Sequence, residues 1–501
     1  MPLDLTPWGD LLAFTASNGS SHPQVWTTDG SVIGTVPVTA FASPTFNAAR
    51  PFNLTAAAGT LFFTHSGLAS VGNELWAIDA AETSGARLVK DLLQGPNSSN
   101  TNGLFHGNDQ HLLFAANINS AGFQLWSSHG LDTDTQPITA LTPAQGVAFF
   151  DYASLPVQFQ GSTYFAGLRS STHHELWRTD GAAASTQLVD TLGNSGTRMF
   201  TRFEPYGGLL YALGTEPSNG QELRVTDGSP NSLNLWADLS TGSGGGVRDI
   251  AALPNGLLVS ARVLIDESSS QIINDPPPFI DHLRALQGPG SELYITTGTV
   301  ESTQLVKDIN PGSGHSSPQN FMAGDTVAWF LANDGTHGFE LWRTDGTADG
   351  TFRLTDIAPA NFLQTNPGQH TFTINLRPGQ AVTTADLLFF TTTSFASNPT
   401  VFSQDLWVSD GTVEGTFRIL DHPGLLDIED ADQAGSIFDL TVVGDTLYFV
   451  APTGVSSTNR AIGYEIHKIG NLPVPEPASV IAFIALTLIT LARRRPSVVS
   501  H

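Results

Sequence analysis

Residues 340–347 read Glu340-Leu341-Trp342-Arg343-Thr344-Asp345-Gly346-Thr347, and variants of this phrase recur about every fifty residues along the 501-residue chain. Its third residue falls at positions 26, 76, 126, 177, 224, 294, 342, 407 and 467, so the chain holds nine units. Five of the eight intervals are 47 to 51 residues long, and the three longer ones carry insertions. A fixed period of this size is typical of solenoids and propellers.

The seventh unit shows the order of apolar runs and turns within a repeat. A β-rich run at 326–331 leads to the turn at 333–335, the phrase follows, and Asp345-Gly346 then reverses the chain into 351–354. Apolar runs joined by such turns predict β-hairpins. A further run precedes this set in each unit, as at 438–441, so each unit is expected to form four short antiparallel strands.

Nine such units predict an all-β protein, a β-propeller of eight to nine four-stranded blades over residues 1–470. Helical repeats are disfavoured, because no unit has a long 3.6-residue periodicity and glycine and proline interrupt every unit. We interpret the Trp of the phrase as packing between neighbouring sheets rather than stacking on a ligand. The Asp of Thr-Asp-Gly is interpreted as a turn former rather than a metal ligand.

The phrase resembles the bacterial ELWxxDGT repeat family, over nearly all of residues 10–467. The resemblance implies a propeller-like scaffold on an exported or surface protein, and it supplies no catalytic residues. Departures from the pattern include 78–80 and 128–130, where the Asp-Gly turn is altered. Irregular hairpin tips are expected at those two places.

The last thirty-one residues differ from the repeats in composition. Residues 471–477 are a Pro-rich linker, 478–492 form a stretch of fifteen residues without a charge, and 493–501 begin with Arg493, Arg494 and Arg495. As a helix, the uncharged stretch spans about 22 Å, against about 30 Å of hydrocarbon core. A basic cluster after it favours a cytoplasmic end, which places the repeat domain outside the cytoplasm.

This tail resembles the PEP-CTERM sorting signal of Gram-negative bacteria. The motif residues are Val474, Pro475, Glu476, Pro477, Ala478 and Ser479, followed by the apolar helix and the three arginines. The resemblance implies recognition by an exosortase-type membrane enzyme and a link to exopolysaccharide matrices. An ordinary C-terminal membrane anchor is the alternative. Both interpretations predict an exported protein in the envelope, at the cell surface or in the extracellular matrix.

The chain begins at Met1 with a run that leads directly into the apolar residues 11–14. A secretory signal peptide has a basic start and an apolar core, and residues 1–10 do not fit that pattern. We therefore expect that the true start lies upstream or that the sequence is a fragment. A strand lost with that segment would have completed the last blade.

Composition excludes some classes of partner. Cysteine is absent, so disulfides do not stabilise the chain. The formal net charge is −25 with only 13% charged residues. An acidic surface repels phosphate backbones, and nucleic-acid binding is not expected.

Few residues in the sequence suggest a catalytic, cofactor-binding or metal-binding site. No nucleophile elbow, phosphate loop or other catalytic motif is present, and no cofactor-binding residues are predicted. The one candidate metal site, for calcium, is Asp427, Glu429, Asp430 and Asp432, whose oxygen ligands suit that ion but whose order does not match an EF-hand. Asp132-Thr133-Asp134 and His173-His174-Glu175 are weaker candidates. The insertions 264–290 and 358–385 are the expected binding surfaces, or else neutral variation.

These observations favour a non-enzymatic, exported repeat scaffold with a binding or adhesion role, whose partners are an exosortase-type enzyme and exopolysaccharide or surface proteins. The membrane is contacted through the C-terminal helix before processing. An extracellular propeller enzyme acting on polysaccharide stays open, because carboxylates from different blades would have no recognisable spacing. A calcium-stabilised surface protein is the third interpretation.

Overall fold

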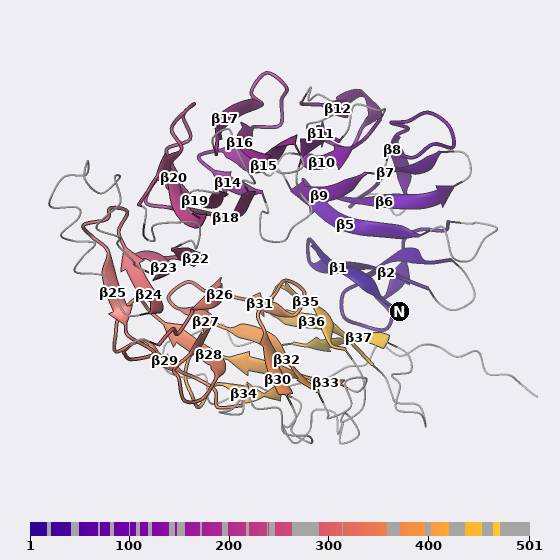
Figure 1. The fold of residues 1–501 in the computed structure, drawn as a ribbon. Helices are drawn as coiled ribbons and strands as arrows, with labels where there is room; N and C mark the ends of the chain where they lie inside the picture. The colour runs from indigo at the N-terminus through magenta and orange to yellow at the C-terminus, as the bar shows by residue number, and fades with distance from the viewer. Residues whose placement is uncertain are drawn as a thin grey trace, which may run out of the picture.

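The computed structural model describes residues 1–17, 22–41, 50–68, 71–80, 85–99, 101–106, 111–118, 123–139, 146–147, 156–170, 173–192, 199–216, 220–237, 239, 246–262, 290–312, 314–357, 371–395, 402–419, 436–452 and 464–470. In these residues the chain forms nine antiparallel sheets arranged in a ring, which is a nine-bladed β-propeller (Figure 1). The prediction of an all-β propeller is therefore confirmed, with nine blades. The predicted C-terminal helix at 478–492 lies outside the described residues.

Each blade comes from one repeat, and its strands follow one another from the centre of the ring outwards (Figure 1). The first three blades contain β1 (Leu3–Trp8), β2 (Leu11–Ala16), β3 (Gln24–Thr28) and β4 (Val36–Pro37); β5 (Pro51–Ala57), β6 (Thr60–Leu68), β7 (Gly72–Asp79) and β8 (Arg87–Lys90); β9 (Asn102–His106), β10 (Leu112–Ala116), β11 (Gln124–Ser128) and β12 (Gln136–Pro137). A short 3-10 helix, η1 (Asp132–Asp134), precedes β12.

The next three blades contain β13 (Gly146–Val147), β14 (Val157–Phe159), β15 (Ser162–Ser170), β16 (His173–Thr179) and β17 (Gln187–Thr191); β18 (Met199–Tyr206), β19 (Leu209–Glu216), β20 (Gly220–Thr226) and β21 (Asn234–Leu235); β22 (Val247–Leu253), β23 (Gly256–Arg262), β24 (Ser291–Thr296) and β25 (Gln304–Lys307). In the fourth blade both β13 and β14 pair with β15.

The last three blades contain β26 (Gln319–Ala323), β27 (Ala328–Asn333), β28 (Phe339–Thr344) and β29 (Phe352–Arg353); β30 (Thr371–Asn375), β31 (Ala381–Thr383), β32 (Leu388–Phe395), β33 (Phe402–Ser409) and β34 (Phe417–Arg418); β35 (Phe438–Val443), β36 (Thr446–Pro452) and β37 (Tyr464–Ile469). Both β30 and β31 pair with β32. Residues 371–375 and 381–383, which the sequence places in the insertion 358–385, form the inner strands of this blade and are therefore part of the repeat.

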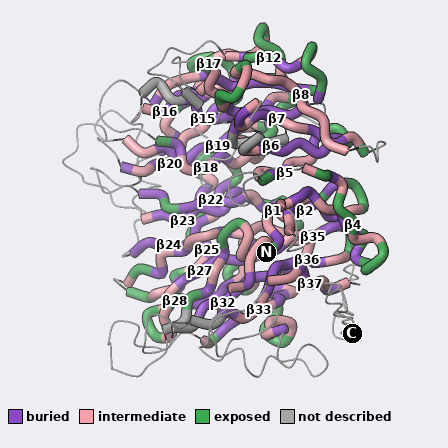
Figure 2. The backbone as a smooth tube through the Cα atoms, turned by 90° about the vertical axis from the view of Figure 1, so that its right-hand side faces the viewer, coloured by how far each residue is buried: buried purple, intermediate pink, exposed green. Residues whose placement is uncertain are grey.

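The core is divided into nine hydrophobic clusters, one at each junction between neighbouring blades. The second strand of a blade is buried on both faces, as in β10, where all five residues from Leu112 to Ala116 are buried. Figure 2 shows these buried positions along the middle strands, with exposed positions gathered at the turns. A strand between two sheets has no solvent-facing side, which explains the continuous apolar runs in the sequence.

The ring closes by packing of the first blade on the last. Leu12 and Phe14 of the first blade share a cluster with Tyr448, Val450 and Ile466 of the last. No described strand crosses this junction, since β1 pairs only within the first blade and the last blade has three described strands. In the described residues, the first and last blades are joined by the packing of these side chains.

The glycine of the phrase lies where the preceding blade touches the turn. Arg178 of the fourth blade donates from Nη1 to the carbonyl oxygen of Gly228 at 2.9 Å, and Tyr211 of the fifth blade donates to that of Gly298 at 3.3 Å. A Cβ on Gly228 would lie 2.1 Å from the hydroxyl oxygen of Tyr164, at a φ of +86°. Glycine is thus required both for the backbone conformation and for the approach of the neighbouring blade.

We expect Gly228→Ala to destabilise the protein by about 2–3 kcal/mol, because it combines a left-handed backbone with a clash against Tyr164. Gly208→Ala is the matched control, since Gly208 also has a positive φ of +79° but no atom within 4 Å of a new Cβ. Gly208→Ala is expected to lower the free energy of unfolding by about 1 kcal/mol. Denaturant unfolding measures both, and equal costs would show that the contact between blades is unimportant.

Candidate functional site

Because the strands of each blade are antiparallel, the loops that connect them lie alternately on the two faces of the ring. Short turns join the first strand to the second, and connections of seven residues that contain the Asp-Gly turn or its variant join the third strand to the fourth in the first eight blades. The connections between second and third strands, and those from one blade to the next, therefore lie together on the opposite face. The insertion after Arg262 emerges on that face, and its residues 263–289 lie outside the described residues.

The Thr-Asp-Gly turn of the phrase is held by side-chain caps in seven blades. The hydroxyl of the Thr or Ser accepts the N–H of the Gly at 2.9 to 3.1 Å in the pairs Thr28–Gly30, Ser128–Gly130, Thr179–Gly181, Thr226–Gly228, Thr296–Gly298, Thr344–Gly346 and Ser409–Gly411. Where the Asp is present it accepts the N–H two residues later at 2.7 to 3.1 Å, as in Asp29, Asp180, Asp227, Asp345 and Asp410. These carboxylates form turns, as the sequence analysis predicts.

In the third copy of the phrase, where His129 replaces the Asp, a different carboxylate stabilises the turn. Asp134 accepts the N–H groups of His129 at 3.2 Å and Leu131 at 3.0 Å, in place of the missing Asp. Asp132 forms an ion pair with Lys90 at 2.9 Å. The candidate Asp132-Thr133-Asp134 thus supports a turn and a junction between blades.

The Glu of the phrase is a buried acceptor that fixes the chain leading to the next blade. In the second blade Glu74, fully buried, accepts the N–H groups of Leu92 at 3.1 Å and Ser99 at 3.0 Å. Glu292 binds Ile309 and Ser316 in the same way. In the first blade a Gln takes this place, and Oε1 of Gln24 accepts the N–H of Phe41 at 2.8 Å.

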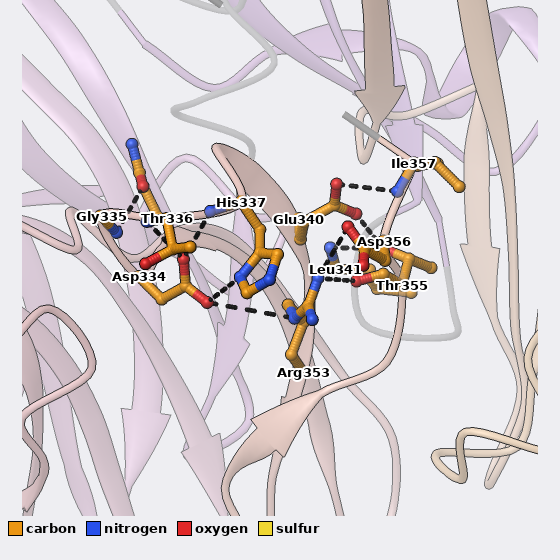
Figure 3. Close-up of polar contacts among 11 residues, drawn as sticks. Asp334, Gly335, Thr336, His337, Glu340, Leu341, Arg353, Thr355, Asp356 and Ile357 are labelled. Atoms are coloured by element: carbon orange, nitrogen blue, oxygen red, sulfur yellow. Dashed lines mark hydrogen bonds and ion pairs between the residues drawn. The ribbon is translucent and has the colours of Figure 1, made fainter. Parts of the chain in front are cut away.

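Figure 3 shows this arrangement in the seventh blade, whose phrase is complete. Glu340 accepts the Thr355 hydroxyl at 2.5 Å and the N–H of Ile357 at 2.8 Å, and the Thr355 hydroxyl in turn accepts the N–H of Leu341 at 3.0 Å. Thr355 and Ile357 follow β29, so these bonds tie the start of the connection to the eighth blade to strand β28. The carboxylate therefore has a structural role.

A second group in Figure 3 lies in the turn between β27 and β28. Asp334 binds the His337 ring at 2.7 Å and accepts the N–H groups of Thr336 and His337 at 2.9 and 2.8 Å. Partial burial acts to raise the pKa of Asp334, but the hydrogen bonds from His337 and Thr336 outweigh it and hold the pKa below its ordinary value. Arg353 bridges Asp334 at 4.0 Å and Asp356 at 3.1 Å, which joins this turn to the end of the blade.

The Trp of the phrase packs on the aromatic ring opposite it in the second strand of its own blade. Trp26, Trp126 and Trp407 are stacked on Phe14, Phe114 and Phe390 with ring centroids 6.4, 6.2 and 5.9 Å apart. His467 replaces Trp in the last blade and is stacked on Phe449 at 5.5 Å. These rings belong to the core between sheets.

The inner strands bring one set of charged groups together around the centre of the ring. Arg202 of β18 binds Asp249 of β22 at 2.8 Å, and Asp249 accepts the N–H of Phe321 in β26 at 2.9 Å. Glu204 lies 3.8 Å from Arg202 and accepts the N–H of Ala252 at 3.3 Å. Burial raises the pKa of Asp249 and Glu204, while Arg202 and the backbone donors oppose it. The contacts join three consecutive blades.

The other sequence candidates fall in two groups. The possible calcium ligands Asp427, Glu429, Asp430 and Asp432, and the motif residues 474–479 with Arg493 to Arg495, lie outside the described residues. His174 is buried, and its Nδ1 accepts the N–H of Phe200 at 3.1 Å, while Glu175 accepts from Nε1 of Trp177 at 3.1 Å. Within the described residues, no group of three His, Asp or Glu side chains could hold a metal ion. No helix there could span a membrane.

His65 is a buried titratable group that the sequence analysis missed. It lies in β6, 1% exposed, with its ring centroid 4.0 Å from that of Phe41 and 6.0 Å from that of Trp76. Neither ring nitrogen has a hydrogen-bond partner in the described part of the chain. Burial lowers the pKa of His65 to about 4. The residue lies outside the phrase, and its partner Phe41 comes from the connection between blades, so repetition does not point to it.

Acidification from pH 6.5 to pH 4 is expected to destabilise the protein through His65 by on the order of 2–3 kcal/mol. The unfolded imidazole binds a proton near pH 6.5, whereas the folded one binds it only near pH 4, so stability falls as the pH falls through this window. His65→Phe removes this contribution while keeping an aromatic ring. Unfolding free energies across the window measure the difference, and equal pH slopes in both proteins would contradict the prediction.

Comparison with known proteins leaves the family open. No family model matches the sequence, and no curated protein matches it. Solved structures of similar fold include a puromycin hydrolase, at 11% identity and a TM-score of 0.39, over 82% of this chain and 60% of that one. Another is a prolyl endopeptidase, at 9% identity and a TM-score of 0.37, over 78% and 54%. At these values the likeness carries no argument about activity.

Proposed function

We propose that the protein is an exported repeat scaffold of the cell surface or extracellular matrix, a member of the ELWxxDGT repeat family, which binds exopolysaccharide or surface proteins. An exosortase-type enzyme sorts it through the motif at 474–479. The observation that carries the proposal is that the polar residues of the repeated phrase have structural roles. The Glu, Thr and Asp of the phrase are engaged in hydrogen bonds that build blades and their connections, as in Glu292, Thr344 and Asp345.

The distribution of loops supports a binding role. On one face the connections between third and fourth strands all have seven residues in the first eight blades. On the other face the connections between second and third strands vary from two residues, between β15 and β16, to twenty-eight, between β23 and β24. Length can therefore vary on this second face without disturbing the blades. Rigid scaffolds commonly place recognition in such loops. The charge of −25 keeps such a surface soluble and repels polyanions that carry phosphate.

Mass spectrometry of the C-terminus after fractionation of the native host tests the sorting step. The expected result is loss of the segment beyond residues 474–479, with the body of the protein at the surface or in the matrix. Glu476→Ala should leave the tail intact and the protein in the inner membrane, whereas Glu414→Ala, at an exposed position between β33 and β34, should be sorted normally. An intact tail on the unaltered protein in the inner membrane would overturn the proposal and indicate a simple membrane anchor.

A further inference from the structure

The first and last blades pack on one another through their inner strands and a shared hydrophobic cluster. Inner strand β1 lies against β35, and the hydroxyl of Thr441 in β35 donates to the carbonyl oxygen of Leu5 at 3.4 Å. Among the described residues no strand is shared between the two blades. The described side chains that meet at this junction contribute to its stability.

Two carboxylates, Asp4 and Asp439, lie on the inner strands β1 and β35, which pack on one another at this junction. Each is half-buried and lies at a register shift of its inner strand, with φ of 57° and 55°. The N–H of Asp4 donates to the carboxylate of Asp439, and the N–H of Asn53 in the second blade donates to that of Asp4. A chain of contacts between bulges thus passes from the last blade through the first to the second.

The charges around this pair leave it short of counter-ions. Burial raises the pKa of Asp4 to about 6, and the charge of Asp439 adds to this effect. Arg50, next to β5, is the described cation that opposes it, together with hydrogen bonds from Thr15 of β2 and from the backbone of Asn53. Burial also raises the pKa of Asp439, against the donated N–H of Asp4.

We propose that the Asp4–Asp439 pair makes the junction of the first and last blades a latch that closes more tightly in mild acid and loosens towards neutral pH. When the junction opens, both carboxyl groups return to water and to their ordinary affinity for protons. The closed junction binds the proton more tightly, so closing is favoured as the pH falls through about 6 towards 3.8. This behaviour is opposite in sign to that of His65.

Hydrogen exchange of the full chain, corrected for the intrinsic exchange rate, tests the latch separately from global unfolding. Amides of β1 and β35 are expected to open about tenfold less often at pH 5 than at pH 7. Amides of β27 and β32, at the junction of the seventh and eighth blades, serve as the internal reference. The double variant Asp4→Asn with Asp439→Asn should lose the difference, while Asp10→Asn, in the exposed turn after β1, should keep it.

The asparagine variants are expected to fold, because Asn53 and Asn320 occupy the equivalent bulges of the second and seventh blades with φ of 56° and 57°. Arg50→Gln should move the transition to higher pH, since Arg50 opposes protonation of Asp4. The proposal is overturned if the double variant keeps the pH dependence of β1 and β35. It is also overturned if β27 and β32 show the same tenfold change.

Discussion

Trp329→Ala is expected to lower the free energy of unfolding by about 3–5 kcal/mol, the range for truncating a large buried side chain. Trp329 lies in β27 and is 0% exposed, packed with Leu388 and Phe390 of the next blade. Its Nε1 donates to the hydroxyl of Ser409 at 3.1 Å, and that hydroxyl caps the turn at Gly411. Removing the indole therefore opens a cavity between two blades and frees a turn. Denaturant unfolding followed by circular dichroism measures the loss.

Two further variants separate the causes of this effect. Trp329→Phe keeps most of the buried volume and should cost about 1–2 kcal/mol, mainly from the lost bond to Ser409. Trp407→Ala removes a Trp of the phrase itself, which is half-buried, and should cost less than Trp329→Ala. An unchanged midpoint for Trp329→Ala would mean that the seventh and eighth blades are held together by other contacts.

The contrast between Trp329 and Trp407 shows what repetition in the sequence can predict. The phrase fixes the blade, its turn and its place in the ring, because every blade must solve the same packing problem. It does not predict which residues contribute most to stability, because the burial of a side chain depends on the neighbouring blade. Trp329, the more deeply buried of the two, lies outside the phrase. Counting units predicted eight to nine blades, and the structure has nine. The closure could not be predicted, because contacts such as that of Thr441 with Leu5 join residues 436 positions apart.

The candidate site was predictable to a smaller degree. The role of Asp345 as a turn former follows from the local chemistry of Asp-Gly sequences. The structure confirms it, since Asp345 accepts the N–H of Thr347. The role of Glu292 could not be predicted, because its partners Ile309 and Ser316 lie in a connection of variable sequence. The cluster of Arg202 and Asp249 joins different blades and leaves no spacing to recognise.

Glu292→Ala is expected to destabilise the protein by about 3–5 kcal/mol, because it leaves several buried donors without an acceptor. Glu292 is 2% exposed and accepts the N–H groups of Ile309 at 2.8 Å and Ser316 at 3.1 Å, together with the Ser316 hydroxyl at 2.6 Å. These donors belong to the connection between the sixth and seventh blades, so the loss is expected to loosen that connection. Denaturant unfolding gives the total cost, and hydrogen exchange at Ile309 and Ser316 locates it.

Glu292→Gln is the matched variant and should cost only about 1 kcal/mol, because an amide oxygen can still accept a backbone N–H, as Gln24 does in the first blade. Burial raises the pKa of Glu292, and the bonds from Ser316 and Ile309 oppose this effect, so the ionised group carries a cost that the amide lacks. Because the pKa of Glu292 is higher in the folded than in the unfolded protein, the folded state binds the proton more tightly and gains stability as the pH falls. The Gln variant should lose this gain. Equal losses for Ala and Gln would show that the negative charge, rather than the acceptor oxygen, holds the connection.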